Sequence, residues 1–253
     1  MKIAEIIDKV APSALPVYRQ AFDRAEQDLA EYGIDTPLRL AHFLSQVLHE
    51  SGGLTVLRES MRYTHGERIL EIFGAGHHSA AIRPDELPGL VGNAEALAER
   101  VYGRGNPKKA LELGNMQPGD GYRYRGNGMI QITGRFAHER FGKLLQVDLE
   151  AAPELATDPR YCLRLAAAEW RDNRCNEAAD LDDIERVTRL VNGGLNGLAE
   201  RRAWLAKVRP LAFAVTFQVP VVPAAMPSPG QGPAPQSWFV RLIQFMIKIF
   251  KRK

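Results

Sequence analysis

Apolar residues recur at helical spacing along most of the first 217 residues, and this pattern predicts a mostly helical chain. Thr36 followed by Pro37 is typical of a helix start, because threonine caps the first turn and proline fits its first position. Gly52 and Gly53 predict where that helix ends. Its apolar stripe consists of Leu40, Phe43, Leu44, Val47 and Leu48.

The same periodicity predicts helical structure over 1–35 and in several later segments. The later ranges are 66–73, 93–102, 135–146, 160–173, 182–191 and 197–209. A loop rich in glycine, histidine and proline is expected at 74–92, and a long glycine-rich loop at 103–128. Few segments alternate with period two, so we expect few and short strands, and no internal repeat is visible.

The composition, 45% hydrophobic and 25% charged, is ordinary for a globular protein and excludes global disorder, a collagen and a disulfide scaffold. The formal net charge of +3 is unevenly distributed. Five of the 33 basic residues and no acidic residue lie in 218–253, which leaves 28 basic against 30 acidic residues in 1–217. This slightly acidic body gives no reason to expect a nucleic-acid partner.

The first fifteen residues include Glu5, Asp8 and Lys9, so they lack the apolar run of a secretory signal. We therefore expect the chain to begin in a cytoplasm. In that reducing compartment, Cys162 and Cys175 are expected to be reduced structural thiols rather than a disulfide. Their spacing fits no metal motif, and we predict neither a metal site nor a cofactor.

Two glutamates flank the double glycine. Glu50 lies at the end of an apolar helix, where the partial negative charge of the helix terminus and burial both raise a carboxyl pKa, as a general acid requires. An unbroken helix would place Glu59 about 13 Å away, but the glycines allow the two carboxylates to face each other across a cleft. Two carboxylates flanking a glycosidic bond are the minimum for sugar hydrolysis, although this spacing alone is a weak signal. Gly53 stands where a zinc protease motif needs its second histidine.

A glycine-rich run at 121–134 carries side chains suited to sugar binding, namely Tyr122, Tyr124, Gln131 and Thr133. Aromatic rings can stack on sugar faces, and the glycines allow a ligand to approach the backbone. No Gly-Lys-Ser/Thr follows, so the run is not a phosphate loop. A glycine-rich hairpin with Ile130 and Ile132 in the core also fits it. In a third patch, 191–197, Asn192 either faces a ligand or caps a helix.

Together these patches resemble the family 19 glycoside hydrolases, and within them the chitinase-like endolysins of bacteriophages and prophages. The resemblance covers roughly residues 36–208. The matching elements are His-Glu-Ser-Gly-Gly at 49–53, Glu59 with Tyr63, the Tyr-Arg-Gly-x-Gly-x-Ile-Gln-Ile-Thr-Gly run at 124–134, Asn192-Gly193-Gly194 and Glu200-Arg201. The resemblance implies a mostly α, lysozyme-like α+β fold: a helical two-lobed domain with a substrate cleft.

The resemblance also implies an inverting mechanism in which Glu50 is the general acid, Glu59 the general base, and Thr133 holds the attacking water. The residues expected to bind substrate or support this pair are His49, Tyr63, Tyr124, Gln131, Asn192 and Arg201. Two positions depart from the family pattern: Ala137 replaces a frequent asparagine and Asn127 a frequent arginine. These departures affect substrate subsites and leave the acid and base intact.

Residues 218–236 are expected to form a proline-rich linker, and 237–253 a cationic amphipathic helix. As a helix, 238–253 would span about 24 Å, which is too short to cross a bilayer, so it should lie in the membrane interface. The expected membrane-contacting residues are Trp238, Arg241, Phe245, Lys248, Lys251 and Arg252. A helix docked on the body or an oligomerisation helix are the alternatives, and the linker argues against docking.

The predicted protein is an endolysin whose domain 1–217 hydrolyses β-1,4 bonds of peptidoglycan and whose tail engages the bacterial membrane or lipopolysaccharide. We expect a monomer, made in the host cytoplasm, that acts at the periplasmic cell wall after membrane permeabilisation. A chitinase acting on chitin oligomers is the alternative enzyme. A membrane-permeabilising antibacterial protein driven by its tail is the alternative of another class.

Overall fold

The computed structural model describes residues 1–217, which fold into helices joined by loops, with isolated bridges in place of extended strands. The predicted mostly helical fold is confirmed. The first helices are α1 (Ile3–Val10), α2 (Pro16–Ala21), α3 (Ala25–Ala30) and α4 (Pro37–Glu50). Next come α5 (Gly66–Phe73), the 3-10 turn η1 (Pro84–Glu86), α6 (Leu87–Leu90), α7 (Ala94–Tyr102), α8 (Pro107–Leu113) and α9 (Asp120–Arg123). The last are α10 (Arg135–Leu145), η2 (Pro153–Thr157), α11 (Cys162–Asp172), α12 (Cys175–Asp180), α13 (Ile184–Asn192) and α14 (Leu198–Ala212).

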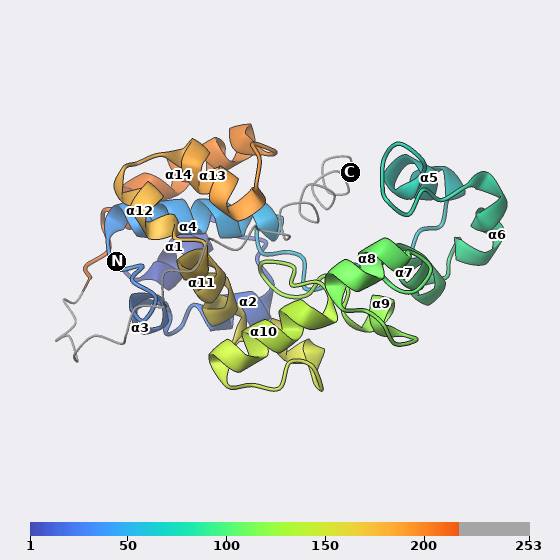
Figure 1. Ribbon diagram of the computed structural model, residues 1–253. Helices are drawn as coiled ribbons and strands as arrows, with labels where there is room; N and C mark the ends of the chain where they lie inside the picture. The colour runs from blue at the N-terminus through green and yellow to red at the C-terminus, as the bar shows by residue number, and fades with distance from the viewer. Residues whose placement is uncertain (218–253) are drawn as a thin grey trace.

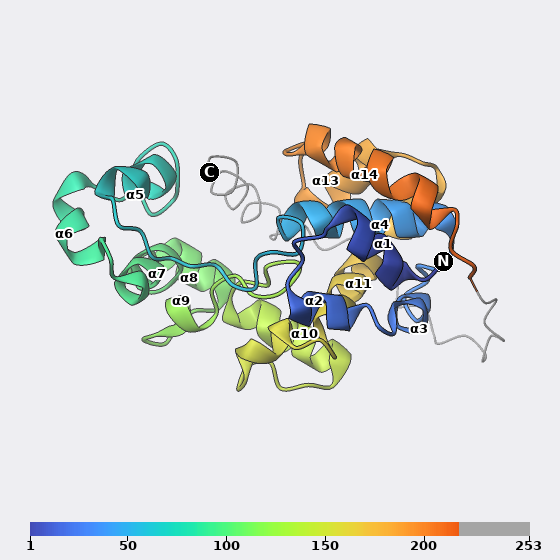
Figure 2. The same ribbon diagram turned by 180° about the vertical axis from the view of Figure 1, so that it is seen from behind.

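Two separate apolar cores divide the described chain into a large and a small lobe (Figures 1 and 2). The large lobe combines α1 to α4 with α10 to α14, and its core includes Phe22, Phe43 and Phe141. The small lobe is built around α5 to α8, and its core includes Phe73 and Tyr102. No buried apolar residue belongs to both cores, so the lobes share no common core and are joined by chain segments.

Helix α4 lies inside the large lobe, where α11 to α14 pack around it, and ten of its fourteen residues are buried. It begins as predicted, because the Thr36 side chain accepts a hydrogen bond from the Arg39 backbone N–H at 3.3 Å. Gly52 and Gly53 take φ values of +59° and +74°, which favour glycine. These two residues end the helix directly after Glu50.

The loop after α4 and the loop before α10 connect the lobes and pair with each other. The backbone N–H of Glu59 donates to the carbonyl of Gly126 at 2.9 Å. Asn127 and Ile132 exchange backbone hydrogen bonds of 3.1 and 2.8 Å. This small patch of bridges fixes Glu59 beside the glycine-rich run that the sequence singled out.

The prediction of one long loop at 103–128 is wrong, because this stretch contains α8 and α9. The Asn106 side chain caps α8 by accepting from the Lys109 backbone N–H at 3.4 Å, and Pro107 follows at the first helical position. This helix-start signal was obscured by the glycine content around it. The stretch 74–92 likewise contains η1 and α6.

The other predicted helices after residue 60 agree with the structure within three residues at each end. Two details differ. The segment 1–35 forms three short helices, and α12 follows α11 as a separate helix. Arg174, with φ of +55°, breaks the chain direction between α11 and α12.

Cys162 and Cys175 are free, buried thiols, as predicted. Burial raises the pKa of Cys162 to about 12, which keeps that thiol protonated and unreactive. Within residues 1–217, no group of three His, Cys, Asp or Glu side chains is placed to hold a metal ion. In the same part of the chain, every helix is too short or too polar to cross a bilayer. The predicted linker 218–236 and tail helix 237–253 lie outside the described residues.

Candidate active site

Glu50, the last residue of α4, is buried beside a guanidinium. Arg201 on α14 forms an ion pair with Glu50 and also donates a hydrogen bond to the side-chain oxygen of Gln46, one turn earlier on α4. The Arg201 side chain is 0% exposed and that of Glu50 is 5% exposed, so each charge is compensated inside the protein. The sequence proposed Arg201 as a supporting residue, and the structure makes it a direct partner of Glu50.

The turn between α13 and α14 positions Arg201. Its Nε donates to the backbone carbonyl of Asn196 at 3.4 Å, and the Asn192 side-chain amide donates to the same oxygen at 3.5 Å. Asn192 is the last residue of α13, and Gly193 occupies the cap position. Asn192 Oδ1 is buried with no hydrogen-bond partner among residues 1–217. Asn192 is therefore not the helix cap, and its side chain instead contacts the turn from which Arg201 extends.

His49 precedes Glu50 and packs against the start of α14. Its imidazole lies against Gly197, where the Cβ of any other residue would overlap the ring. Gly197 also has φ of +72°, so glycine is required at this position for two reasons. This contact fixes the last turn of α4 to α14 next to the Glu50–Arg201 pair.

Glu59, in the loop after α4, is the second buried carboxyl group, at 4% exposure. The Tyr102 hydroxyl donates to Glu59 Oε1 at 2.9 Å, whereas Oε2 has no hydrogen-bond partner within the described chain. Arg125 donates to the backbone carbonyl of Glu59 at 3.0 Å. Burial raises the pKa of Glu59 to about 7, against the lowering effects of the Tyr102 hydrogen bond, the Gly126 backbone and the Arg125 charge.

Tyr63 lies half-buried in the same neighbourhood. Its ring packs edge-on against Phe73 with centroids 5.8 Å apart. Burial, followed by the negative charge of Glu59, holds the pKa of Tyr63 above its ordinary value. The structure thus brings Tyr63 near Glu59, four residues away in the chain.

Gln131 and Thr133 belong to the glycine-rich loop that pairs with Glu59. The Thr133 hydroxyl donates to the Gln131 backbone carbonyl at 2.9 Å, and the Gln131 side-chain amide donates to the Gly128 carbonyl at 2.7 Å. Both side chains are buried, and Gln131 Oε1 has no partner in the part of the chain that is described. The Thr133 oxygen keeps lone pairs that can accept a hydrogen bond from a water molecule.

Tyr124 does not present its ring for stacking on a sugar, contrary to our expectation. It is 1% exposed, its hydroxyl donates to the Glu150 carbonyl at 2.9 Å, and its ring packs against His138. Tyr122 is half-buried, with the Arg125 guanidinium 3.9 Å from its ring centroid. Tyr122 lies in the short helix α9 and Tyr124 directly follows it, and their spacing in the sequence does not reveal which ring points inward.

Glu169 on α11 is a third buried glutamate, which the sequence did not single out. Burial, and then the negative charge of Glu50, raise its pKa to about 8, so Glu169 is mostly protonated at neutral pH. The available signal was an acidic residue within the apolar Leu163–Trp170 run of a predicted helix. An acid there requires either a partner or a proton.

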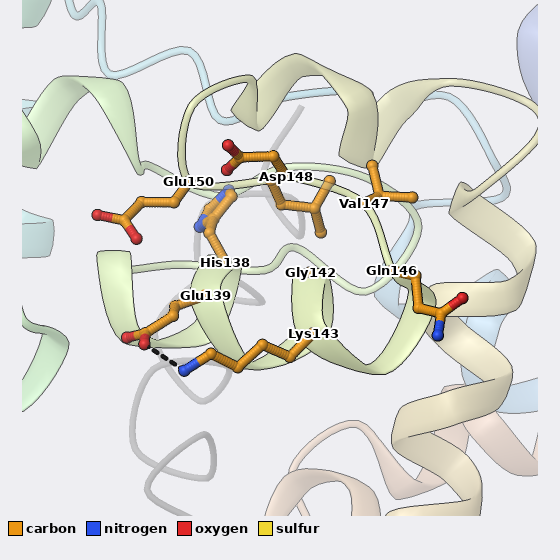
Figure 3. A pocket seen from close by; sticks show the side chains of 9 residues that line it. His138, Glu139, Gly142, Lys143, Gln146, Val147, Asp148 and Glu150 are labelled. Carbon is orange, nitrogen blue, oxygen red and sulfur yellow. Dashed lines mark hydrogen bonds and ion pairs between the residues drawn. The ribbon is translucent and has the colours of Figure 1, made fainter.

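A pocket of about 330 Å³ lies between α10 and the segment that leads to Glu150 (Figure 3). Its lining comprises His138, Glu139, Gly142, Lys143, Gln146, Val147, Asp148, Leu149 and Glu150. Glu139 and Lys143 form an ion pair at its edge. None of the predicted site residues lines this pocket, so the candidate site is defined by the surroundings of Glu50 and Glu59.

The chain is similar to a protein of Haemophilus influenzae described as a glycosyl hydrolase family 19 domain-containing protein. The two are 32% identical over 204 residues, which cover 79% of this chain and 92% of the relative. No family model matches the chain.

Among solved structures, the fold is similar to that of chitinase C from Streptomyces griseus HUT6037, with a TM-score of 0.54 and 18% identity over 86% of this chain and 94% of the other. A chitinase C variant with one glutamate replaced by glutamine gives a TM-score of 0.55 and 16% identity over 86% and 78% of the two chains. The fold and the relatives therefore show that the protein is a glycoside hydrolase, an enzyme that cleaves glycosidic bonds. Within that class, the chain belongs to glycosyl hydrolase family 19.

Proposed function

We propose that this glycoside hydrolase is an endolysin that cleaves β-1,4 bonds of bacterial peptidoglycan with inversion, using Glu50 as general acid and Glu59 as general base. The observation that carries the proposal is a pair of buried glutamates with different partners. Glu50 is paired with the cation Arg201, whereas Glu59 accepts from the neutral Tyr102 and has one oxygen without a partner. The different surroundings distinguish the two carboxyl groups. Which of them is the acid and which the base follows from the resemblance of their motifs to those of family 19.

The ion pair with Arg201 describes the ionised form of Glu50, so in this mechanism Glu50 takes up a proton from solvent before each turnover. That proton passes to the glycosidic oxygen as the bond from that oxygen to the anomeric carbon breaks. A water molecule held by Thr133 attacks the opposite face of the anomeric carbon and gives its proton to Glu59. The sugar leaves with inverted configuration, Glu50 is ionised, Glu59 is protonated, and solvent restores both. Arg201 stabilises the carboxylate that Glu50 becomes. Because Glu59 must be ionised to accept a proton, activity falls as the pH drops below its pKa of about 7.

Product analysis tests the reaction and the substrate together. We expect digestion of purified peptidoglycan to produce new reducing ends. Mass spectrometry of the products then shows whether MurNAc or GlcNAc carries the new reducing end. Early time points by proton NMR should show the α-anomer, as inversion of a β-bond requires. Glu59→Gln is the inactive control. The solved chitinases with this fold make chitin the second candidate substrate, and rapid turnover of chitin oligomers with inert peptidoglycan would establish that alternative.

We place the ability to reach an intact Gram-negative envelope in the tail 237–253, which lies outside the described residues. Residues 218–253 contain five basic residues and no acid, and their apolar and basic positions follow a helical pattern. A cationic amphipathic helix binds anionic lipid surfaces such as the outer membrane. We propose that the enzyme is made in the host cytoplasm and reaches the periplasmic wall once the inner membrane is permeabilised.

Ending the chain after Phe217 is expected to leave hydrolysis of bare peptidoglycan unchanged. Lysis of intact Gram-negative cells should fall at least tenfold, because the chain loses five basic residues that each contribute about 1 kcal/mol at an anionic membrane surface. A full-length control with Arg241, Lys248 and Lys251 replaced by glutamine keeps the length but loses three charges. Its lysis of intact cells should lie between that of the truncated chain and that of the unchanged chain. Lysis by the truncated chain equal to that by the full chain would remove the membrane role. Undiminished killing by a Glu50→Gln protein would instead favour the membrane-permeabilising alternative.

A further inference from the structure

Tyr102, at the end of α7, connects the small lobe to the candidate base. Its side chain is fully buried in the small-lobe core, and its hydroxyl lies 2.9 Å from Glu59 Oε1. Its backbone carbonyl accepts a hydrogen bond from the Asn115 side chain at 3.0 Å, which fixes the end of α7. Tyr102 stands 43 residues from Glu59 and outside every motif, so the sequence alone does not single it out.

We propose that Tyr102 is a positioning residue for Glu59, holding one carboxylate oxygen so that the other faces the attacking water. This inference rests on the proposed function, in which Glu59 is the general base. It adds a residue whose only action on the reaction passes through Glu59.

The two oxygens of Glu59 differ in their partners. Oε1 accepts from Tyr102, and Oε2 is buried with no hydrogen-bond partner among residues 1–217. A carboxylate rotates freely about its last bond unless a donor fixes one oxygen. A donor that is itself rigid therefore determines where the second oxygen points, and a base must lie within hydrogen-bond reach of the water that it deprotonates.

Tyr102 is suited to this task because its hydroxyl remains a donor. Burial, followed by the nearby charge of Glu59, holds the pKa of Tyr102 well above its ordinary value, so the phenol stays protonated. The hydrogen bond in turn favours the ionised form of Glu59 and offsets part of the cost of burying that charge.

The other titratable or charged groups that face Glu59 act differently. Arg125, from the loop before α10, donates to the backbone carbonyl of Glu59 rather than to its carboxylate, and Arg58 lies close to Arg125. Tyr63, on the same segment as Glu59, interacts with it through charge. The Gly126 backbone also lowers the pKa of Glu59. Among the side chains of the described part of the chain, Tyr102 is the one that is hydrogen-bonded to the carboxylate.

The test is the pH profile of Tyr102→Phe on purified peptidoglycan, with kcat and KM measured separately. We expect the acidic limb to move to higher pH by about one unit, which corresponds to about 1.4 kcal/mol, because the variant loses a bond that stabilises the ionised base. At the high-pH plateau we expect kcat to fall about tenfold with KM little changed, since the base is no longer oriented.

Tyr18→Phe is the matched control. It also removes one tyrosine hydroxyl from a fully buried ring, but that hydroxyl donates to the backbone carbonyl of Val56 at 2.7 Å, outside the acid–base pair. Its acidic limb should stay in place even if both variants lose some thermal stability. If the acidic limbs of Tyr102→Phe and Tyr18→Phe fall at the same pH while Glu59→Gln is inactive, the positioning role of Tyr102 is overturned and the proposed function is not. An active Glu59→Gln enzyme would overturn the proposed function itself.

Discussion

Replacing Glu50 with glutamine is expected to lower kcat on peptidoglycan by about 10²- to 10⁴-fold, the usual contribution of a positioned acid or base. The amide matches the carboxyl group in size and still accepts a hydrogen bond from Arg201, but it has no acidic proton for the glycosidic oxygen. Release of reducing ends from purified cell wall measures the loss. Thermal unfolding checks that the variant is folded.

Leaving-group chemistry separates the role of Glu50 from that of Glu59. A substrate whose leaving group departs without a proton, such as an aryl glycoside with a nitrophenol, should restore much of the activity of Glu50→Gln and none of that of Glu59→Gln. The exposed Glu177→Gln is the matched control and should behave as the unchanged enzyme. Equal recovery of the two site variants would contradict the assignment of acid and base, and full activity of Glu50→Gln on cell wall would remove Glu50 from the mechanism.

Replacing Arg201 with methionine is expected to lower the free energy of unfolding by about 3–5 kcal/mol. The change keeps much of the side-chain volume but leaves Glu50 buried without its cation, and leaves the Gln46 oxygen without its donor. Urea unfolding followed by circular dichroism gives the free energy.

The neighbouring residue of α14 provides the control for this second prediction. Arg202 is half-exposed and pairs with Glu185 at the surface, at 2.7 Å, so Arg202→Met should cost no more than about 1 kcal/mol. The double variant with Glu50→Gln should recover part of the Arg201→Met loss, because the unpaired charge is then absent. Equal losses at Arg201 and Arg202 would show that the buried pair contributes nothing specific to stability.

Local signals predicted much of the fold. The Thr36-Pro37 start and the Gly52-Gly53 end of α4 are properties of adjacent residues, and the structure contains both. The sequence was misleading where two local signals competed. In 103–128 the glycines indicated a loop, while Asn106 and Pro107 had the chemistry of a helix start, and α8 forms there.

The candidate site was predicted only as far as its motifs reach. Glu50 and Glu59 stand in recognisable runs, but their partners come from distant segments. Arg201 is 151 residues from Glu50, and Tyr102 is 43 residues from Glu59. Burial is also a tertiary property, which is why Tyr124 was expected at a surface and Glu169 went unnoticed.

The two separate cores have a consequence for how the protein loses activity on heating. A small core surrounded by short helices opens at a lower free energy than a large one, because less apolar surface holds it closed. Tyr102 belongs to the small core, whereas the segment around Glu50 belongs to the large one. Partial melting of the small lobe therefore releases the hydrogen bond to Glu59 while most helices persist, and activity declines before the helical signal disappears.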